Sequence, residues 1–338
     1  MTGIQLKTPV VLLVFNRPTH SEQVFSAVRR VQPERLLIVA DGPRPGREGE
    51  ATKCEQVREI VTAVDWDCEV LTNFAETNLG CAERVISGLT WVFEQTDSAI
   101  ILEDDCLPGH DFFRFCEELI PRYKDDDRIA SIGGNNFCGP SPGPYSYHFS
   151  QISEIWGWAG WRSSWQRYDR TLRDWPAVKA SNFLFEIFED QHLVEYWTKI
   201  FDSTHAQRDH PITWDYQWYY TNLVSHRLTI TPAQNLVKNI GFGPEATHTK
   251  EFPGFELPEI GRIEFPLMHP PCLVPSRSLD RRTQQNQLFS DRESKSNVSI
   301  AQRALEDRPP APTRRYGQIF AERAKQLIGR VLHCDRSV

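Results

Sequence analysis

The chain has 338 residues, 40% of them hydrophobic and 25% charged, which suits one large α/β domain or two smaller ones in an ordinary globular protein. Its formal net charge of −7 argues against a nucleic-acid-binding protein, because such proteins present basic surfaces. No apolar run approaches the roughly 18 residues that span a membrane, and no signal-peptide pattern opens the chain, so we expect a cytoplasmic protein. Its eight cysteines lack zinc-binding spacing, which favours reduced thiols.

Apolar strands alternate with amphipathic helices through the first 132 residues. Strands are predicted at 9–15, 35–40, 68–71, 99–102 and 129–132, and helices at 21–31, 51–64, 82–94 and 108–123. This alternation predicts an α/β fold with a Rossmann-like, mostly parallel central sheet flanked by helices. Neither a G-x-G-x-x-G pattern nor a P-loop follows the first strand, so a nucleotide would have to be bound by side chains at strand ends.

The apolar run of residues 99–102 leads directly into Glu103, Asp104 and Asp105. The run predicts a buried strand, and ligands of open α/β sheets bind beyond the carboxyl ends of such strands. Adjacent carboxylates repel one another, so we expect a cation beside them, and hard oxygen ligands suit Mg²⁺ or Mn²⁺. The competing interpretation is a solvated acidic turn.

Charged side chains also follow two other predicted strands. Asp41 ends the second strand, where a carboxylate can accept hydrogen bonds from a base or ribose; an Asp-Gly turn is the alternative. Arg17 follows the first strand and can pair with a phosphate, or it is a surface residue at a helix start. Arg84 has the same two interpretations, a phosphate-binding residue or a surface residue, and ranks below Arg17 as a functional candidate.

Residues 133–270 form an aromatic second half, with five of the ten tryptophans between Trp156 and Trp175. Trp156 and Trp158 can form a stacking floor for a sugar ring, although core packing is the commoner role of tryptophan. Asp215 stands between aromatic residues, which would desolvate its carboxylate and suit a general base; a helix cap is the alternative.

The last part of the chain changes composition. Residues 271–313 contain few apolar residues and predict an extended linker or a wrap-around tail. Residues 314–338 predict an amphipathic helix with basic positions, which either docks back on the domain or lies peripherally at the inner membrane surface.

From about Pro9 to His248 the chain resembles the nucleotide-sugar glycosyltransferases of the GT-A fold. More narrowly it resembles the N-acetylglucosaminyltransferase I type and bacterial family 2 (hemolysin-like) relatives. Residues 100–105, Ile-Ile-Leu-Glu-Asp-Asp, followed by Asp-Phe-Phe at 111–113, look like the E-D-D block of that family and the D-F-F after it. The resemblance implies an inverting, metal-dependent transferase.

The resemblance also implies roles for individual residues on the donor side. Asp41 would bind the uridine, and Arg17 would approach the nucleotide. Glu103 and Asp104 would contact the donor sugar and ribose, and Asp105 would bind the metal directly. Arg84 is retained as a further donor-binding candidate.

Trp158, a further donor-binding candidate, belongs to a segment that resembles the glycine-tryptophan segment before the acceptor side of the family. Asp215 matches its catalytic base, although Tyr-Gln follows at 216–217 where a second acidic residue is expected. Asn239 begins a stretch similar to the loop that closes over the donor and is a donor-binding candidate. Apart from the resemblance, His248 is a candidate second metal ligand, with phosphate binding as the alternative.

We therefore predict a hexosyl- or N-acetylhexosaminyltransferase that uses Mn²⁺ or Mg²⁺ and moves a sugar from a nucleotide-diphosphate donor, a UDP-sugar favoured, to a hydroxyl of a glycan, glycolipid or protein acceptor. Residues 1–132 would bind the donor, and residues 133–270 of the same domain the acceptor. A catalytically silent carbohydrate-binding protein is the alternative. A sugar-nucleotide pyrophosphorylase ranks lower, because residues 16–19 are a poor match for its glycine- and arginine-rich loop.

Overall fold

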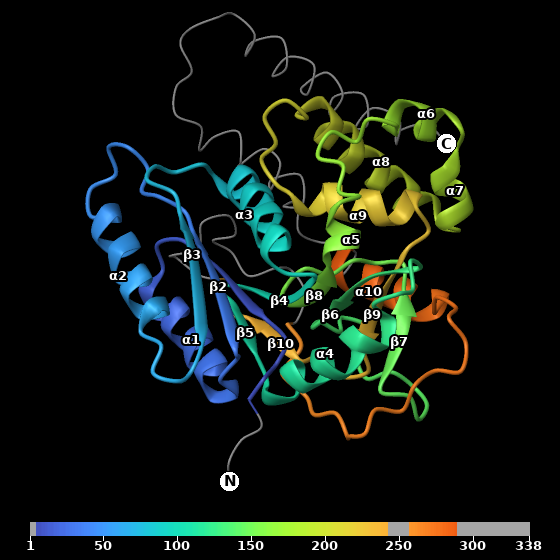
Figure 1. Cartoon of the computed structure of the whole chain (residues 1–338). Helices are drawn as coiled ribbons and strands as arrows, with labels where there is room; N and C mark the ends of the chain where they lie inside the picture. Colours follow the sequence, from blue (N-terminus) through green and yellow to red (C-terminus); the bar gives the residue numbers. More distant parts are fainter. Residues whose placement is uncertain (1–4, 243–256, 289–338) are drawn as a thin grey trace, which may run out of the picture. The chain divides into compact units, whose positions relative to one another are not determined.

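One eight-stranded sheet runs through the part of the chain that the computed structural model describes, residues 5–242 and 257–288 (Figure 1). Its strand order is β3 (Glu69–Phe74), β2 (Arg35–Ala40), β1 (Val10–Val14), β4 (Ser98–Glu103), β8 (Trp158–Trp161), β6 (Ile129–Gly133), β9 (Leu228–Pro232) and β7 (Tyr147–Ser150). Strands β3, β2, β1 and β4 are mutually parallel, and β6 is parallel to β9, whereas β8 and β7 are antiparallel to their neighbours. The predicted Rossmann-like α/β fold is confirmed.

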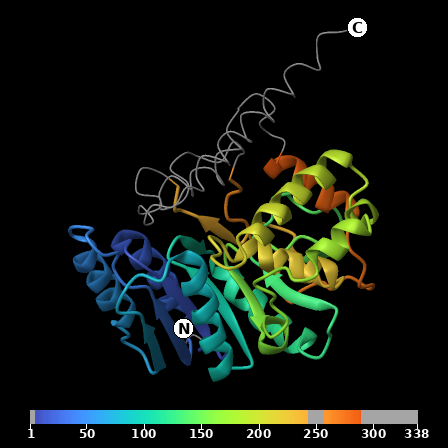
Figure 2. The same ribbon diagram turned by 90° about the horizontal axis from the view of Figure 1, so that it is seen from above.

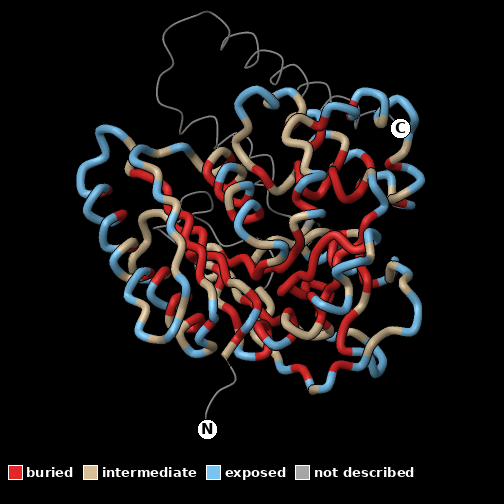
Figure 3. Tube along the Cα trace, in the orientation of Figure 1, coloured by how far each residue is buried: buried red, intermediate tan, exposed pale blue. Residues whose placement is uncertain are grey.

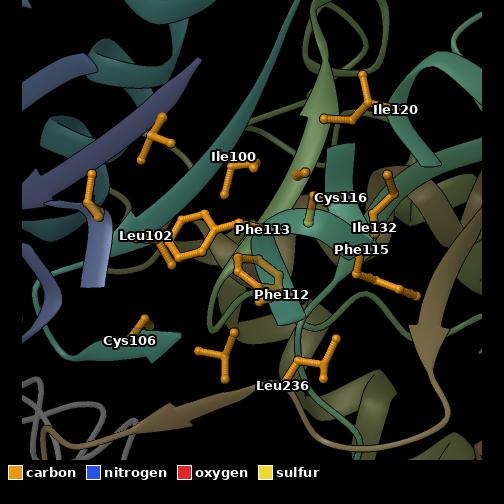
Figure 4. Packing of buried hydrophobic residues seen from close by; sticks show 14 of the residues in the cluster. Ile100, Leu102, Cys106, Phe112, Phe113, Phe115, Cys116, Ile120, Ile132 and Leu236 are labelled. Atoms are coloured by element: carbon orange, nitrogen blue, oxygen red, sulfur yellow. The ribbon is translucent and has the colours of Figure 1, made fainter. Parts of the chain in front are cut away.

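Helices cover both faces of the parallel strands, as predicted, and the central strand β1 is apolar and buried at every position. Val10 and Leu12 of β1 pack in one cluster with α1 (Pro18–Val31), α2 (Glu50–Thr62) and α4 (His110–Tyr123). Val11 and Leu13 face the opposite side, where α3 (Cys81–Gln95) packs. Figure 4 shows the phenylalanines of α4 packed against this sheet, and Figure 3 shows the central strands as the most deeply buried part of the unit. Alternate residues of a strand therefore pack into two separate hydrophobic cores, one on each face of the sheet.

Helices gather over the second half of the sheet, away from α1 and α2 (Figures 1 and 2). They are α5 (Arg162–Trp165), α6 (Trp175–Ala180), α7 (Phe183–Ile187), α8 (Gln191–Ala206) and α9 (Asp215–Val224). Four tryptophans, at 158, 165, 214 and 218, join β8, α5 and α9 in the cluster that also holds the apolar face of α3. Most of the predicted aromatic half is thus core.

The region predicted as an extended linker contains a helix, α10 (Arg277–Leu288). Its inward positions are largely polar: Asp280, Thr283 and Gln284 are buried beside Leu279. Because hydrophobic periodicity is the main helix signal, a helix that docks through polar side chains gives almost none. His248 and the predicted helix at 314–338 lie outside the described residues. None of the helices within those residues has the length and apolarity needed to cross a membrane.

Candidate functional site

Several charged residues singled out in the sequence meet at one edge of the sheet. In the registers of β1, Val14 pairs with Ala40 of β2 and Leu13 with Glu103 of β4, so the residues that follow these strands emerge side by side. Arg17 follows β1, and Glu103 is the last residue of β4. This edge is where ligands of open parallel sheets bind.

The acidic triplet is held by a single arginine and by the backbone. Nη1 of Arg17 lies 2.7 Å from Oδ2 of Asp105 and 3.4 Å from Oδ1 of Asp104. The backbone N–H of Phe15 donates to Oδ2 of Asp104 at 3.3 Å. Charges from the ends of two neighbouring strands are therefore in direct contact.

The triplet carries more negative charge than Arg17 offsets. Burial, followed by repulsion from Asp105 and Asp104, raises the pKa of Glu103 well above its usual value. Burial and repulsion from Asp105 raise the pKa of Asp104 to about 7. Burial opposes the charge on Arg17, but the attraction of the three carboxylates outweighs it and raises the pKa of the guanidinium. An added cation would relieve this repulsion.

Asp41 stands at the same edge, but its carboxylate already has partners on both oxygens. Oδ1 accepts from the backbone N–H groups of Gly42 and Leu79, and Oδ2 accepts from Gly80 N–H and the side chain of Asn78, all at 2.8–3.2 Å. Asp41 is 5% exposed. These contacts fix the loop that leads into α3. A nucleotide bound by Asp41, as predicted, would have to compete with the hydrogen bonds that its carboxylate already accepts.

The Arg84 side chain makes its hydrogen bonds to the neighbouring strand β3. Its guanidinium donates to the backbone carbonyl and to Oδ1 of Asn73, near the end of β3. Burial lowers its pKa, and the attraction of Asp41 only partly offsets the effect. These contacts tie the start of α3 to β3, which agrees poorly with the predicted role in donor binding.

Asp215 joins the same group of charges from the other half of the chain. It is the first residue of α9, and the hydroxyl of Thr213 donates to its Oδ1. It lies close enough to contribute to the raised pKa values of Glu103 and Cys81. The structure thus brings the predicted base and the acidic triplet together.

Cys81, the first residue of α3, is a site residue that the sequence does not reveal. Burial raises its pKa strongly, and Glu103, Asp215, Asp105 and Asp41 all add to the shift. Its thiol therefore lies near these carboxylates, and burial together with their negative charge keeps it neutral. A single cysteine at a helix start carries no signal that would have pointed to this position.

Asn239 is placed beside the triplet by a small antiparallel pair. Strand β10 (Val237–Asn239) pairs with β5 (Cys106–Pro108), with Asn239 opposite Cys106. The next residue, Ile240, donates its N–H to the carbonyl of Asp105 at 2.8 Å, and Oδ1 of Asn239 accepts from Gly241 N–H at 2.8 Å. A Cβ at Gly241 would collide with the Asp105 side chain, so only glycine fits there.

Trp158 does not offer a face to a ligand, in contrast to the sequence-based expectation. Its side chain is 2% exposed, and its ring stacks on Trp214 with centroids 6.1 Å apart. Trp156 is the better-placed ring. It is half-buried, and its edge contacts Phe137 and Phe242 at centroid distances of 5.4 and 5.6 Å. Because β8 runs antiparallel to β4, the residues just before β8 lie at the edge where Glu103 ends β4.

The site suits a hard divalent cation by the chemistry of its donors. Within the described residues, no three or more His, Cys, Asp or Glu side chains are arranged around one metal position. The carboxylates of Glu103 and Asp105 nevertheless offer hard oxygen ligands in a region of surplus negative charge. Mg²⁺ and Mn²⁺ are commonly held by one or two carboxylates together with substrate phosphates and water. The residues present therefore fit such an ion.

No family model and no curated protein matches this chain. Solved structures that resemble part of it include HddC from Yersinia pseudotuberculosis, with 11% identity, a TM-score of 0.30, and coverage of 46% of this chain and 77% of that one. A UDP-glucose pyrophosphorylase complexed with UDP-glucose has 10% identity, a TM-score of 0.25, and coverage of 44% and 64%. The inositol-1-phosphate CTP transferase from T. maritima has 11% identity, a TM-score of 0.28, and coverage of 48% and 74%. Likenesses this weak support no conclusion about function.

Proposed function

We propose that this chain is a metal-dependent inverting glycosyltransferase that moves a hexose or N-acetylhexosamine from a nucleotide-diphosphate donor, a UDP-sugar favoured, to an acceptor hydroxyl. One observation carries the proposal: Asp215 at the start of α9 lies near enough to the acidic triplet to repel Glu103, and Trp214 before it stacks on Trp158 of β8, the strand paired with β4. A transferase of this class needs a charged site for the diphosphate and a separate carboxylate for the acceptor proton.

On the donor side, Asp105 and Glu103 would hold Mn²⁺ or Mg²⁺. When bound, the ion supplies Lewis-acid stabilisation of the charge that develops on the leaving diphosphate. Arg17 would bind a phosphate oxygen, since its guanidinium already lies within 2.7 Å of Asp105. Asn239 and Gly241 would approach the donor from the β10 side. His248, the second predicted metal ligand, lies outside the described residues.

On the acceptor side, Asp215 would accept the proton of the attacking hydroxyl. The acceptor oxygen forms a bond to the anomeric carbon from the face opposite the diphosphate. The bond from that carbon to the diphosphate oxygen breaks, and its electron pair leaves with the diphosphate, so the configuration inverts. The hydroxyl of Thr213, which donates to Oδ1 of Asp215, would orient the carboxylate during this step.

Turnover of UDP-sugars by the wild type and Asp215→Asn tests the proposal. The variant should keep metal-dependent binding of UDP and lose transfer by about 10²–10⁴-fold, the range for a lost general base. Asp67→Asn, a change at an exposed carboxylate elsewhere, should have no effect. Unchanged transfer by Asp215→Asn would remove the base assignment. Formation of UTP from UDP-sugar and pyrophosphate would replace the proposal with a pyrophosphorylase, and sugar binding that ignores chelator, without turnover, would replace it with a silent binding protein.

A further inference from the structure

Glu154 is a carboxylate of the site that the sequence does not reveal. It is half-buried in the segment between β7 and β8, and its Oε1 accepts a hydrogen bond from Nε2 of Gln287 at 3.1 Å. No donor within the described part of the chain reaches its other oxygen, Oε2. One oxygen is thus fixed by α10, and the other is available to a ligand.

Helix α9 faces this carboxylate with polar groups. Asp215 repels Glu154 and, after burial, is the second cause that raises its pKa, to about 7. Tyr219 lies one turn beyond Asp215 on α9, and Glu154 contributes to the raised pKa of its phenol. The Tyr219 hydroxyl is buried, with the residue 4% exposed, and has no hydrogen-bond partner within the described residues. Buried polar atoms are normally hydrogen-bonded, so we expect this hydroxyl to bind a water or a ligand.

Trp156, two residues after Glu154, adds an apolar surface. Its indole is half-buried and meets Phe242, next to Gly241 and hence close to Asp105, and also meets Phe137. Helix α10 holds both sides of this arrangement. Asn286 donates to the carbonyl of Phe137 at 2.7 Å, and the adjacent Gln287 donates to Glu154.

Trp156 and Glu154 are two residues apart, and α10 contacts both Glu154 and the Phe137 ring on which Trp156 packs. An aromatic ring and a carboxylate oxygen together suit a sugar, whose C–H face packs on a ring while its hydroxyls donate hydrogen bonds. We propose that Trp156 and Glu154 form the acceptor subsite: the indole packs against a pyranose ring, and Oε2 of Glu154 accepts a hydrogen bond from a hydroxyl of that ring. The inference rests on the proposed function and narrows the acceptor to a glycan or glycolipid sugar. A purely structural Glu154, which only anchors α10, is the competing explanation.

Saturation-transfer NMR with methyl glycosides of glucose, galactose, mannose and N-acetylglucosamine tests the subsite, on the full chain with UDP and diamagnetic Mg²⁺ present. At least one glycoside should bind the wild type, and Glu154→Ala and Trp156→Leu should each weaken it about tenfold, the effect of one lost charge-assisted hydrogen bond or ring contact. Glu154→Gln keeps an oxygen for Gln287 and serves as the second variant if Glu154→Ala does not fold.

Matched controls change a carboxylate and an indole of similar burial elsewhere. Glu118 accepts one hydrogen bond, from Leu267 N–H at 3.1 Å, and Trp66 contacts one aromatic ring, Phe25. Glu118→Ala and Trp66→Leu should bind glycosides as the wild type does. Failure of every glycoside to bind the wild type, or full binding by Glu154→Ala and Trp156→Leu, would overturn the subsite.

Calorimetry with UDP and Mn²⁺ on the same samples separates the two proposals. Glycoside binding that depends on Glu154 without any nucleotide binding would support the sugar subsite and remove the transferase. Nucleotide binding without glycoside binding would support the transferase and remove the sugar subsite.

Discussion

Asp41 and Asp104 both follow buried parallel strands, yet their carboxylates meet different surroundings. Burial raises the pKa of Asp41, and the donors on both of its oxygens, three of them backbone N–H groups, offset only part of this rise. Asp104 has one backbone donor and a distant arginine contact, and its neighbour Asp105 repels it. Hydrogen bonds within the fold stabilise the Asp41 carboxylate. The Asp104 carboxylate needs a further positive charge beside it, which the described residues do not supply.

At Asp41 we therefore predict a stability effect. Asp41→Ala should lower the free energy of unfolding by about 2–4 kcal/mol, because several buried donors lose a charged acceptor at once. Chemical denaturation measures this, with Asp67→Ala as the exposed control. A loss below about 0.5 kcal/mol would show that the loop does not depend on this carboxylate.

At Gly241 we predict a loss of function without loss of fold. Gly241→Ala places a Cβ against the side chain of Asp105, about 2.8 Å from its Cβ and Cγ, and should displace the carboxylate. Metal-dependent binding of UDP should fall at least tenfold in calorimetry. Gly133→Ala is the control, since its nearest neighbour would be 3.6 Å away. Equal affinities for the two variants would argue against a role of Asp105 in the site.

Helix α10 docks largely through polar contacts. Asp280 accepts from the Ser150 hydroxyl at 2.6 Å and from Gln151 N–H at 3.0 Å. Burial raises its pKa to about 6 despite these bonds. One turn further, Gln284 is buried, and Gln287 reaches Glu154. Positions 280, 284 and 287 lie on one face of the helix. This face therefore contacts both the buried Ser150–Gln151 segment and Glu154.

The raised pKa of Asp280 predicts that α10 docks more tightly in acid. A carboxyl whose pKa is higher in the folded state, about 6 against the ordinary 3.8, binds its proton more tightly there, so its contribution to stability grows as pH falls from about 6 to 4 and is lost as pH rises through this window. The effect is about 2–3 kcal/mol for two pKa units. Hydrogen-exchange protection of residues 277–288 should follow this trend, and Asp280→Asn should flatten it. A wild-type protection that is equal at pH 4.5 and 7 would contradict the prediction.

How far the sequence predicts each element depends on what buries it. β1, β2 and β4 could be predicted because parallel strands covered on both faces are continuously apolar. The contact of Arg17 with the acidic triplet could not, because it depends on β1 lying beside β4. β8, with the sequence Trp-Ala-Gly-Trp, has no strand pattern, and α10 has no apolar stripe. Glu154 and Cys81 could not be found because their proximity to Asp215 depends on how α3, α9 and the segment before β8 pack.

For the described unit as a whole, the two halves of the chain share one sheet: β8 pairs antiparallel with both β4 and β6, and β9 runs parallel to β6. Trp158 on β8 stacks with Trp214 and Trp218, which flank Asp215 and lie in α9 or just before it. Burial of these rings therefore connects the strand that carries the triplet with the helix that carries Asp215.

We predict that Trp158→Ala lowers the free energy of unfolding by about 3–5 kcal/mol, as for large buried aromatic residues. Transfer activity should also fall, because α9 loses the ring that its tryptophans pack on. Trp91→Ala, at a half-buried position of α3, should cost less. Thermal and chemical unfolding of the two variants provide the comparison, and similar losses in both would contradict a central role for this tryptophan cluster.

The central claim is a metal-dependent nucleotide site at the carboxyl edge of the sheet, and calorimetric titration tests it most directly. UDP, GDP and dTDP are each titrated into the protein with and without Mn²⁺, and again into Asp105→Ala with Asp67→Ala as control. We predict that one nucleotide, UDP, binds only when the metal is present and that Asp105→Ala abolishes this binding. Absence of nucleotide binding under every condition, or binding that ignores both the metal and Asp105, would contradict the claim and leave the triplet as an acidic turn.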